Sequence, residues 1–220
     1  MNKKKIAIIE TTLVPLQDLR ELFFEIIPEA EIISFVDDSM LKEVISAGKP
    51  TPNVIRRYCS YAVNAESIGS NLIFNQCSSV GEVADIAQQM VNIPIFKTDL
   101  PMAQEAVEKG TKIGVVATLN TTLNPTSRLI QKVADEKGKK ITIIPKLAEG
   151  AFELVSRGDK EGHNKLVIKT IQELASSVDI IALAQGSMAV LIPDLKGVDI
   201  PVLSSPRSGV LGAKALLETL

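Results

Sequence analysis

The sequence predicts an α/β fold built from two similar parallel-sheet domains. We expect a pseudo-two-fold axis to relate them, with a site in the cleft between them. Two observations carry this prediction. Short apolar runs of the kind that form buried parallel strands alternate with amphipathic helical patterns along all 220 residues, which is typical of an α/β protein. In addition, two regions of the first half recur in the second half at nearly the same spacing.

In the first half, four apolar runs are expected to form strands. They lie at residues 5–9, 31–35 and 72–74, and directly after Pro94. Apolar residues at helical spacing predict helices between them. These helices are expected to begin near Pro15, at a cap formed by Asp38 or Ser39, at the pair Thr51–Pro52, and at Val80.

The second half continues the alternation. Its expected strands are residues 112–116, 141–144, 179–184 and 201–203. Its expected helices begin at Pro101 and near Pro125, and then span residues 147–155 and 165–176. A last helix is expected over residues 209–217, after the final strand. Because a helix separates most successive strands, the sheets are predicted to be mostly parallel.

An internal repeat divides the chain. The segment KKIAIIETT is echoed by TKIGVVATL, so that Ile6 matches Ile113 at an offset of 107 residues. The segment FNQCSS is echoed by LAQGSM, so that Cys77 matches Gly186 at an offset of 109 residues. We therefore predict that residues 1–97 together with 207–220 form the first α/β half, and that residues 98–206 form the second.

Composition excludes several classes of function. A net charge of −2 without a dense cluster of Lys and Arg disfavours a nucleic-acid partner. The apolar run in MNKKKIAIIE stops at Glu10 and no later stretch approaches a membrane span, so we expect a cytoplasmic protein with no membrane partner. Two cysteines and one histidine provide neither a disulfide framework nor a zinc site. Because GxGxxG and GxxxxGK[ST] are absent, we expect no nucleotide cofactor.

Cys77 stands out in the stretch Leu72–Phe96, where a short strand pattern breaks at NQCSS and a helical pattern follows. A thiol at a strand-to-helix turn lies near the backbone N–H groups of the first helical turn, which favour an anion and lower a thiol pKa. Position alone fits a buried, inert cysteine equally well.

Four loops that end strands carry Ser or Thr, and open parallel sheets bind ligands at the carboxyl ends of their strands. The loops contain Thr11 and Thr12, residues 77–79, residues 118–122, and residues 185–188. Hydroxyl and N–H groups at such loops make a cradle for a carboxylate or a small phosphate. Simple capping of the following helices is the alternative.

The duplicated halves, the NQCSS, ATLNTT and LAQGSM loops, and the segment AEGAFELVSRGDKEGHNKL resemble the aspartate/glutamate racemase superfamily. That group also includes hydantoin and allantoin racemases, maleate isomerases and arylmalonate decarboxylases. The resemblance implies a cofactor-independent enzyme that acts at the carbon α to a carboxylate. It also implies a small carboxylate substrate, a role in amino acid metabolism and a homo-oligomer. In the racemases, two cysteines serve opposite faces of the substrate. Cys77 matches the first cysteine, whereas Gly186 occupies the place of the second.

This departure leaves several alternatives open. Cys77 works alone as the acid/base of an isomerase, or of a single-cysteine decarboxylase or lyase. Alternatively, Ser187 or a bound water serves the second face. In a third account, the protein is a non-catalytic small-anion binder.

The predicted catalytic residue is Cys77. The predicted substrate-binding residues are Thr11, Thr12, Asn75, Ser78, Ser79, Thr118, Thr121, Thr122, Gln185, Gly186 and Ser187. Thr11 and Thr12 fall where the racemases usually have Asp-Ser, and the acid is displaced to Glu10. Three other residues have weaker claims: His163 is expected in a surface or capping role, Cys59 in the core, and Arg207 at the anion or at the domain junction.

Overall fold

The computed structural model describes residues 3–13 and 16–220, so Pro15, where the first helix is expected to begin, lies outside the described residues. The chain divides into two compact units. Unit 1 comprises Met1–Thr98 and Pro206–Leu220, and unit 2 comprises Asp99–Ser205. Each unit is a parallel sheet with flanking helices, which confirms the predicted fold class.

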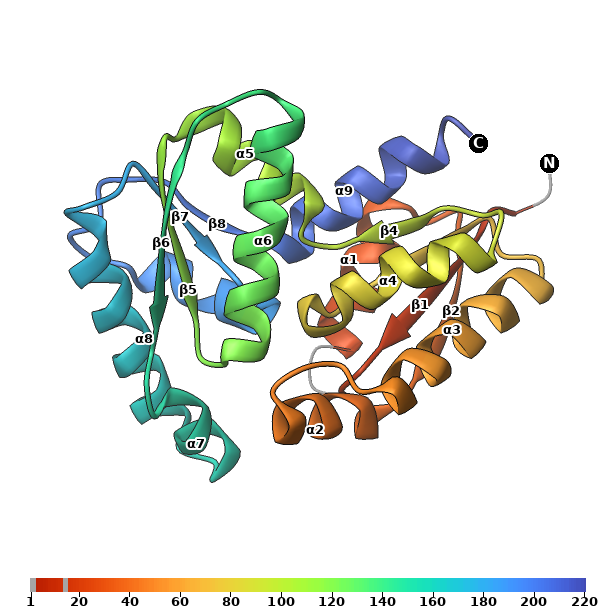
Figure 1. Ribbon diagram of the computed structural model, residues 1–220, viewed down its shortest axis with the longest axis horizontal. Helices are drawn as coiled ribbons and strands as arrows, with labels where there is room; N and C mark the ends of the chain where they lie inside the picture. The colour runs from red at the N-terminus through yellow and green to blue at the C-terminus, as the bar shows by residue number, and fades with distance from the viewer. Residues whose placement is uncertain (1–2, 14–15) are drawn as a thin grey trace. The chain divides into compact units, whose positions relative to one another are not determined.

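In the part of unit 1 that the structure describes, four parallel strands form one sheet (Figure 1). The order β2-β1-β3-β4 corresponds to Glu31–Val36, Lys5–Glu10, Leu72–Asn75 and Ile95–Lys97. The register pairs Ile9 of β1 with Phe35 of β2 and with Asn75 of β3. The carboxyl ends of β1 and β3 therefore lie side by side, and the loops that follow them are neighbours.

The helices of unit 1 are α1 (Leu16–Ile26), α2 (Asp38–Ala47), α3 (Pro52–Ser67), α4 (Gly81–Ala87) and α9 (Ser205–Leu217, from Pro206 onward). Thr51 caps α3 through a bond from the N–H of Val54, as predicted. The cap of α2 is Asp37, not Asp38 or Ser39, because this first residue after β2 has a non-helical backbone and its carboxylate accepts a hydrogen bond from the N–H of Ser39.

The prediction of one continuous helix from Val80, with Met90 on its apolar face, is wrong. Short 3-10 turns, η1 (Ser78–Val80) and η2 (Gln88–Met90), flank α4. Val80, Val83 and Ala87 are buried, but Ile86 and Met90 are exposed. The side chain of Gln88 binds the carbonyls of Val91 and Ile93 and the N–H of Ile95, which holds the chain in a turn toward β4.

The sheet of unit 1 is covered on both faces, because successive side chains of a strand point to opposite sides. On one face, Ala7, Ile9 and Ile73 pack with α2, α3 and α4. On the other face, Phe74 packs edge-to-face on Phe23 of α1 and stacks on Phe96 of β4. Figure 1 shows α3 and α4 in front of this sheet and α1 and α9 behind it.

Unit 2, which the structure describes completely, repeats this plan. Its parallel strands follow the order β6-β5-β7-β8, corresponding to Thr142–Leu147, Lys112–Ala117, Ile180–Leu183 and Val202–Ser204. The order is that of unit 1 with each strand number raised by four, as the internal repeat requires. Pro145 is tolerated because β6 is an edge strand.

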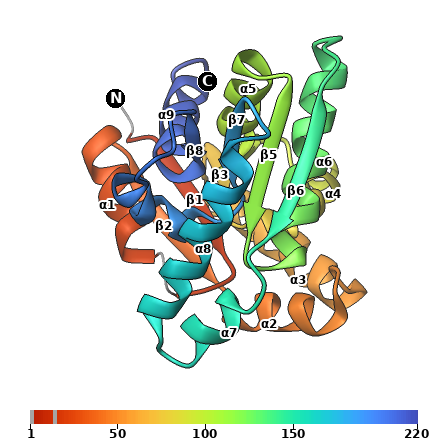
Figure 2. The same cartoon turned by 90° about the vertical axis from the view of Figure 1, so that its left-hand side faces the viewer.

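The helices of unit 2 are α5 (Leu100–Lys109), α6 (Asn120–Glu136), α7 (Ala151–Ser156) and α8 (Lys160–Ala175), together with the 3-10 segment η3 (Gly186–Asp194). Helix α6 begins five residues before Pro125, and η3 occupies a stretch for which no element is predicted. Packing places α5 and α6 on one face of the sheet and α7, α8 and η3 on the other. Figure 2 shows α6 and α8 on opposite sides of β5 and β6.

No described helix is long and apolar enough to cross a membrane. No three His, Cys, Asp or Glu side chains of residues 3–13 and 16–220 are grouped so that they could hold a metal ion.

Candidate active site

The loops after β1 and β3 meet at the carboxyl edge of the unit 1 sheet. Beyond the last paired residues, the N–H of Gln76 still donates to the carbonyl of Ile9 at 3.3 Å, and the N–H of Thr98 donates to the carbonyl of Asn75 at 3.0 Å. These bonds hold the start of the Cys77 loop between β1 and β4. The loop that carries Thr11 and Thr12 is its neighbour.

Cys77 is the last extended residue before η1 and is 8% exposed. Its carbonyl accepts hydrogen bonds from the N–H of Val80 at 3.2 Å and from the side-chain amide of Asn75 at 3.1 Å. Burial raises the pKa of the Cys77 thiol. The hydroxyl of Thr11, the N–H and hydroxyl of Ser79 and the N–H of Val80 oppose that rise. The thiol therefore lies in an enclosed place with hydrogen-bond donors around it.

Several polar atoms at this edge are buried. Apart from the Cys77 thiol that they face, the Thr11 and Ser79 hydroxyls have no hydrogen-bond partner among the described residues, and the side-chain carbonyl of Gln76 has none there either. Buried polar groups are almost always paired in folded proteins, so unpaired ones mark a place for water or a ligand. Ser78 is also buried, and Thr12 is half-buried.

Asn75 is expected to contact the substrate, but its amide is occupied within the fold. The residue is fully buried, its side-chain carbonyl accepts the hydroxyl of Tyr58 at 2.9 Å, and its amide nitrogen donates to the carbonyl of Cys77. Tyr58 lies on α3, the helix that the sequence predicts to begin at Thr51–Pro52, and it is absent from the predicted site residues. A tyrosine on an otherwise apolar helix face, in a chain whose β3 ends on Asn, is the signal that was available.

Glu10 ends β1 with a fully buried side chain. Because Ile9 packs toward α3, the alternation of a strand directs Glu10 to the opposite face, near Ser34 of β2 and Arg20 of α1. Burial raises the pKa of Glu10 to about 7, although the Ser34 hydroxyl and the Arg20 charge lower it in part. Cys77 packs in the cluster on the α3 face, so the acid and the thiol lie on different faces of the sheet.

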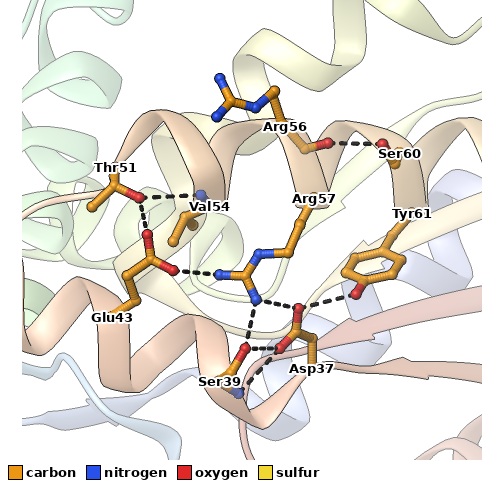
Figure 3. Close-up of polar contacts among 9 residues, drawn as sticks. All are labelled: Asp37, Ser39, Glu43, Thr51, Val54, Arg56, Arg57, Ser60 and Tyr61. Carbon is orange, nitrogen blue, oxygen red and sulfur yellow. Dashed lines mark hydrogen bonds and ion pairs between the residues drawn. The ribbon is translucent and has the colours of Figure 1, made fainter.

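A charged cluster follows β2 (Figure 3). The Asp37 carboxylate accepts hydrogen bonds from Ser39, Tyr61 and Arg57, with Arg57 at 2.8 Å. The second amino group of Arg57 binds Glu43 at 2.6 Å. Burial raises the pKa of Asp37, but these partners together lower it by a larger amount, so the pKa of Asp37 lies below its usual value. Arg57 is thus held by two carboxylates and serves to join α2 to α3.

In unit 2, the loops after β5 and β7 adjoin, since the N–H of Ala184 donates to the carbonyl of Val116. The side-chain carbonyl of Gln185 accepts both the N–H and the hydroxyl of Thr118, at 2.6 and 2.9 Å. The hydroxyl of Thr122, in the first turn of α6, donates to the carbonyl of Leu119 at 2.9 Å.

The remaining predicted residues of unit 2 differ in exposure. The hydroxyl of Thr121 is buried and unpartnered within the part of the chain that the structure describes. Gly186 is half-buried at the start of η3, and Ser187 is exposed. The predicted site residues therefore form two groups. One surrounds Cys77 in unit 1, and the other lies at the matching sheet edge of unit 2.

The three weaker candidates have other partners. Cys59 lies on α3 and packs in the core of unit 1, as predicted, and burial raises the pKa of its thiol. His163 lies in the first turn of α8, with a ring nitrogen 2.9 Å from the side-chain oxygen of Asn164. Arg207 forms an ion pair with Glu25 of α1 within unit 1.

A thiol at the carboxyl edge of one unit of a duplicated α/β fold is the arrangement that the resemblance implies, and comparison with known proteins bears on it directly. The family model described as Asp/Glu/Hydantoin racemase matches residues 8–212. The chain belongs to this racemase family. The glutamate racemase of Synechocystis sp. is 30% identical over 120 residues, which cover 53% of this chain and 40% of that protein. The chain thus aligns with less than half of the length of this curated relative.

Solved structures of this racemase family share the fold. Glutamate racemase from Francisella tularensis, solved in complex with D-glutamate, has a TM-score of 0.78 at 15% identity. The match covers 100% of this chain and 82% of that one. Allantoin racemase from Klebsiella pneumoniae has a TM-score of 0.69 at 15% identity, over 98% of this chain and 88% of that one. These likenesses confirm the fold of two α/β units.

Proposed function

We propose that this racemase-family chain is a cofactor-independent isomerase that acts at the carbon α to the carboxylate of a small amino acid or related acid. Cys77 is its acid/base. The observation that carries the proposal is the setting of the Cys77 thiol: it is enclosed, and hydrogen-bond donors from Thr11, Ser79 and Val80 surround it.

The proposed step places a second negative charge on the substrate. The Cys77 thiolate takes the α-hydrogen, an S–H bond forms, and the electrons of the C–H bond pass into the carboxylate as an enediolate. Preorganised donors are needed to stabilise that charge, and one such donor is worth about 3 kcal/mol. We assign this task to Thr11, Thr12, Ser78 and Ser79 in unit 1, and to Thr118, Thr121, Thr122 and Ser187 in unit 2.

A second candidate, a single-cysteine lyase, is favoured by the raised pKa of the Cys77 thiol together with Gly186 in place of a second thiol. A thiol with a raised pKa is protonated at rest, which suits a proton donor. In a decarboxylation, the bond to the departing carboxylate breaks and CO₂ leaves. Cys77 then protonates the enediolate carbon, and solvent restores the thiol. This reaction needs one proton donor on one face.

Incubation in D₂O with amino acids, hydantoins and substituted malonates tests both reactions. We expect deuterium uptake at the α-carbon, or CO₂ release, that falls by at least about 100-fold in Cys77→Ser, because a positioned acid/base contributes about 10² to 10⁴ in rate. Cys59→Ser, which alters the other buried cysteine, should retain activity. Activity that survives in Cys77→Ser overturns the assignment, and binding without exchange on any compound indicates a small-anion binder.

The variant Gly186→Cys restores a thiol at the matching place in unit 2. If Cys77 works from one face alone, this variant should gain racemisation of a compound that the parent deuterates without inverting. An unchanged product profile would count against the one-thiol account.

A further inference from the structure

Tyr58 is a fully buried phenol in the core of unit 1. Its neighbours on α3 that face the sheet, among them Val54, Cys59 and Ala62, are apolar. Its hydroxyl hydrogen-bonds to the side chain of Asn75 at 2.9 Å, and Asn75 is itself fully buried. A buried pair of polar side chains costs desolvation energy unless it is fully bonded, so its place next to a functional loop invites an explanation.

The direction of the bond follows from the groups around it. The amide of Asn75 faces the carbonyl of Cys77 at 3.1 Å, and a carbonyl only accepts. The nitrogen of the amide must therefore point at Cys77, because two acceptors would repel each other. The amide oxygen is then left facing the phenol, and Tyr58 must donate its proton to it. The result is an ordered relay from Tyr58 through Asn75 to the carbonyl of Cys77.

The relay acts on the peptide that sets the direction of η1. The carbonyl of Cys77 accepts from Asn75 and from the N–H of Val80, which closes the first turn of η1. Rotation of this peptide would carry the N–H groups of Ser79 and Val80 away from the thiol. Tyr58 is also near the thiol itself, since a charge on Cys77 contributes to the raised pKa of the phenol after the larger effect of burial.

We propose that Tyr58 and Asn75 are positioning residues, which hold the Cys77 turn so that the thiol faces the N–H donors of Ser79 and Val80. The inference rests on the proposed function only in giving Cys77 a reaction to perform. If Tyr58 and Asn75 had only a structural role, replacing them would lower stability and leave the reactivity of Cys77 unchanged. The reactivity of the Cys77 thiol is therefore the quantity to measure.

The experiment compares two tyrosines of one helix. Tyr58→Phe removes the hydroxyl that binds Asn75. Tyr61→Phe removes the hydroxyl that binds Asp37 at 3.0 Å in the charged cluster of Figure 3. Both are made in the full chain with Cys59→Ser, so that Cys77 is the remaining thiol. The rate of Cys77 alkylation by iodoacetamide is measured against pH, and urea unfolding is measured in parallel.

We expect Tyr58→Phe to raise the apparent pKa of Cys77 by about one unit, which makes alkylation about tenfold slower at a pH below that pKa. Tyr61→Phe should leave the profile unchanged. A Tyr58→Phe profile that superimposes on the parent overturns the proposal, and so does an equal displacement in both variants, which would indicate general loosening.

A second variant keeps the proposal testable if Tyr58→Phe fails to fold. Asn75→Asp keeps the acceptor for Tyr58 but places an oxygen against the carbonyl of Cys77, and it should also slow alkylation about tenfold or more. An unchanged profile in Asn75→Asp overturns the relay. Alkylation requires no substrate, so a displaced profile together with absent D₂O exchange would refute the proposed function while leaving the positioning role intact.

Discussion

Replacing Glu10 by Gln should stabilise the protein relative to the parent, and by more as the pH rises, because Glu10 is a carboxyl group buried inside unit 1. Burial raises its pKa from 4.5 to about 7. Well below pH 4.5, the group is protonated in both the folded and the unfolded chain, and the substitution changes little. Between pH 4.5 and about pH 7, the unfolded chain releases the proton while the folded chain keeps it, so the stability of the parent falls as the pH rises. At about pH 8 the free energy of unfolding of Glu10→Gln should exceed that of the parent by about 3 kcal/mol, since each unit of pKa shift corresponds to about 1.36 kcal/mol.

The assay is urea unfolding of the parent and of Glu10→Gln at several pH values between about 4 and 8. Far-ultraviolet circular dichroism is the suitable signal, because the chain contains no tryptophan. Glu25→Gln is the matched control: its bond with Arg207 lowers the pKa of Glu25, so removing Glu25 should matter more as the pH rises and with the opposite sign. If the free energies of unfolding of the parent and of Glu10→Gln differ by the same amount at every pH, the reasoning is refuted.

Two further substitutions probe the site and the packing. Thr11→Val removes a buried hydroxyl that lowers the Cys77 pKa, so alkylation of Cys77 should slow about tenfold at fixed pH. Thr126→Val, which removes a buried hydroxyl of α6 in unit 2, should leave that rate unchanged, and an equal effect of both substitutions would contradict the contact of Thr11 with Cys77. Gly209→Ala should cost about 1–3 kcal/mol in urea unfolding, because its Cβ would lie 2.5 Å from the carbonyl oxygen of Thr98. The Cβ added by Gly81→Ala would meet nothing within 4 Å. A comparable loss of stability in Gly81→Ala would show that the close contact with Thr98 is not the cause of the loss in Gly209→Ala.

Much of the fold is encoded locally. The alternation of apolar runs with helical patterns predicts the parallel α/β class, and the cap at Thr51 with Pro52 marks the start of α3 at the observed residue. Where local signals compete, the prediction misses. Asp37 takes the cap of α2 because β2 extends to Val36, and the helix after Cys77 breaks into short turns because Gln88 binds the backbone leading to β4.

The sequence by itself determined that the chain has two similar halves and that Cys77 follows a buried strand, because repeats and periodicity are properties of neighbouring residues. Only the tertiary structure decided what surrounds that thiol. Tyr58 meets Asn75 across 17 residues, and Thr118 meets Gln185 across 67. Strand order and register bring such pairs together, and they also bury Glu10 on the face opposite Cys77. Periodicity records which face of an element is apolar, but it carries no record of which distant polar group that face will meet.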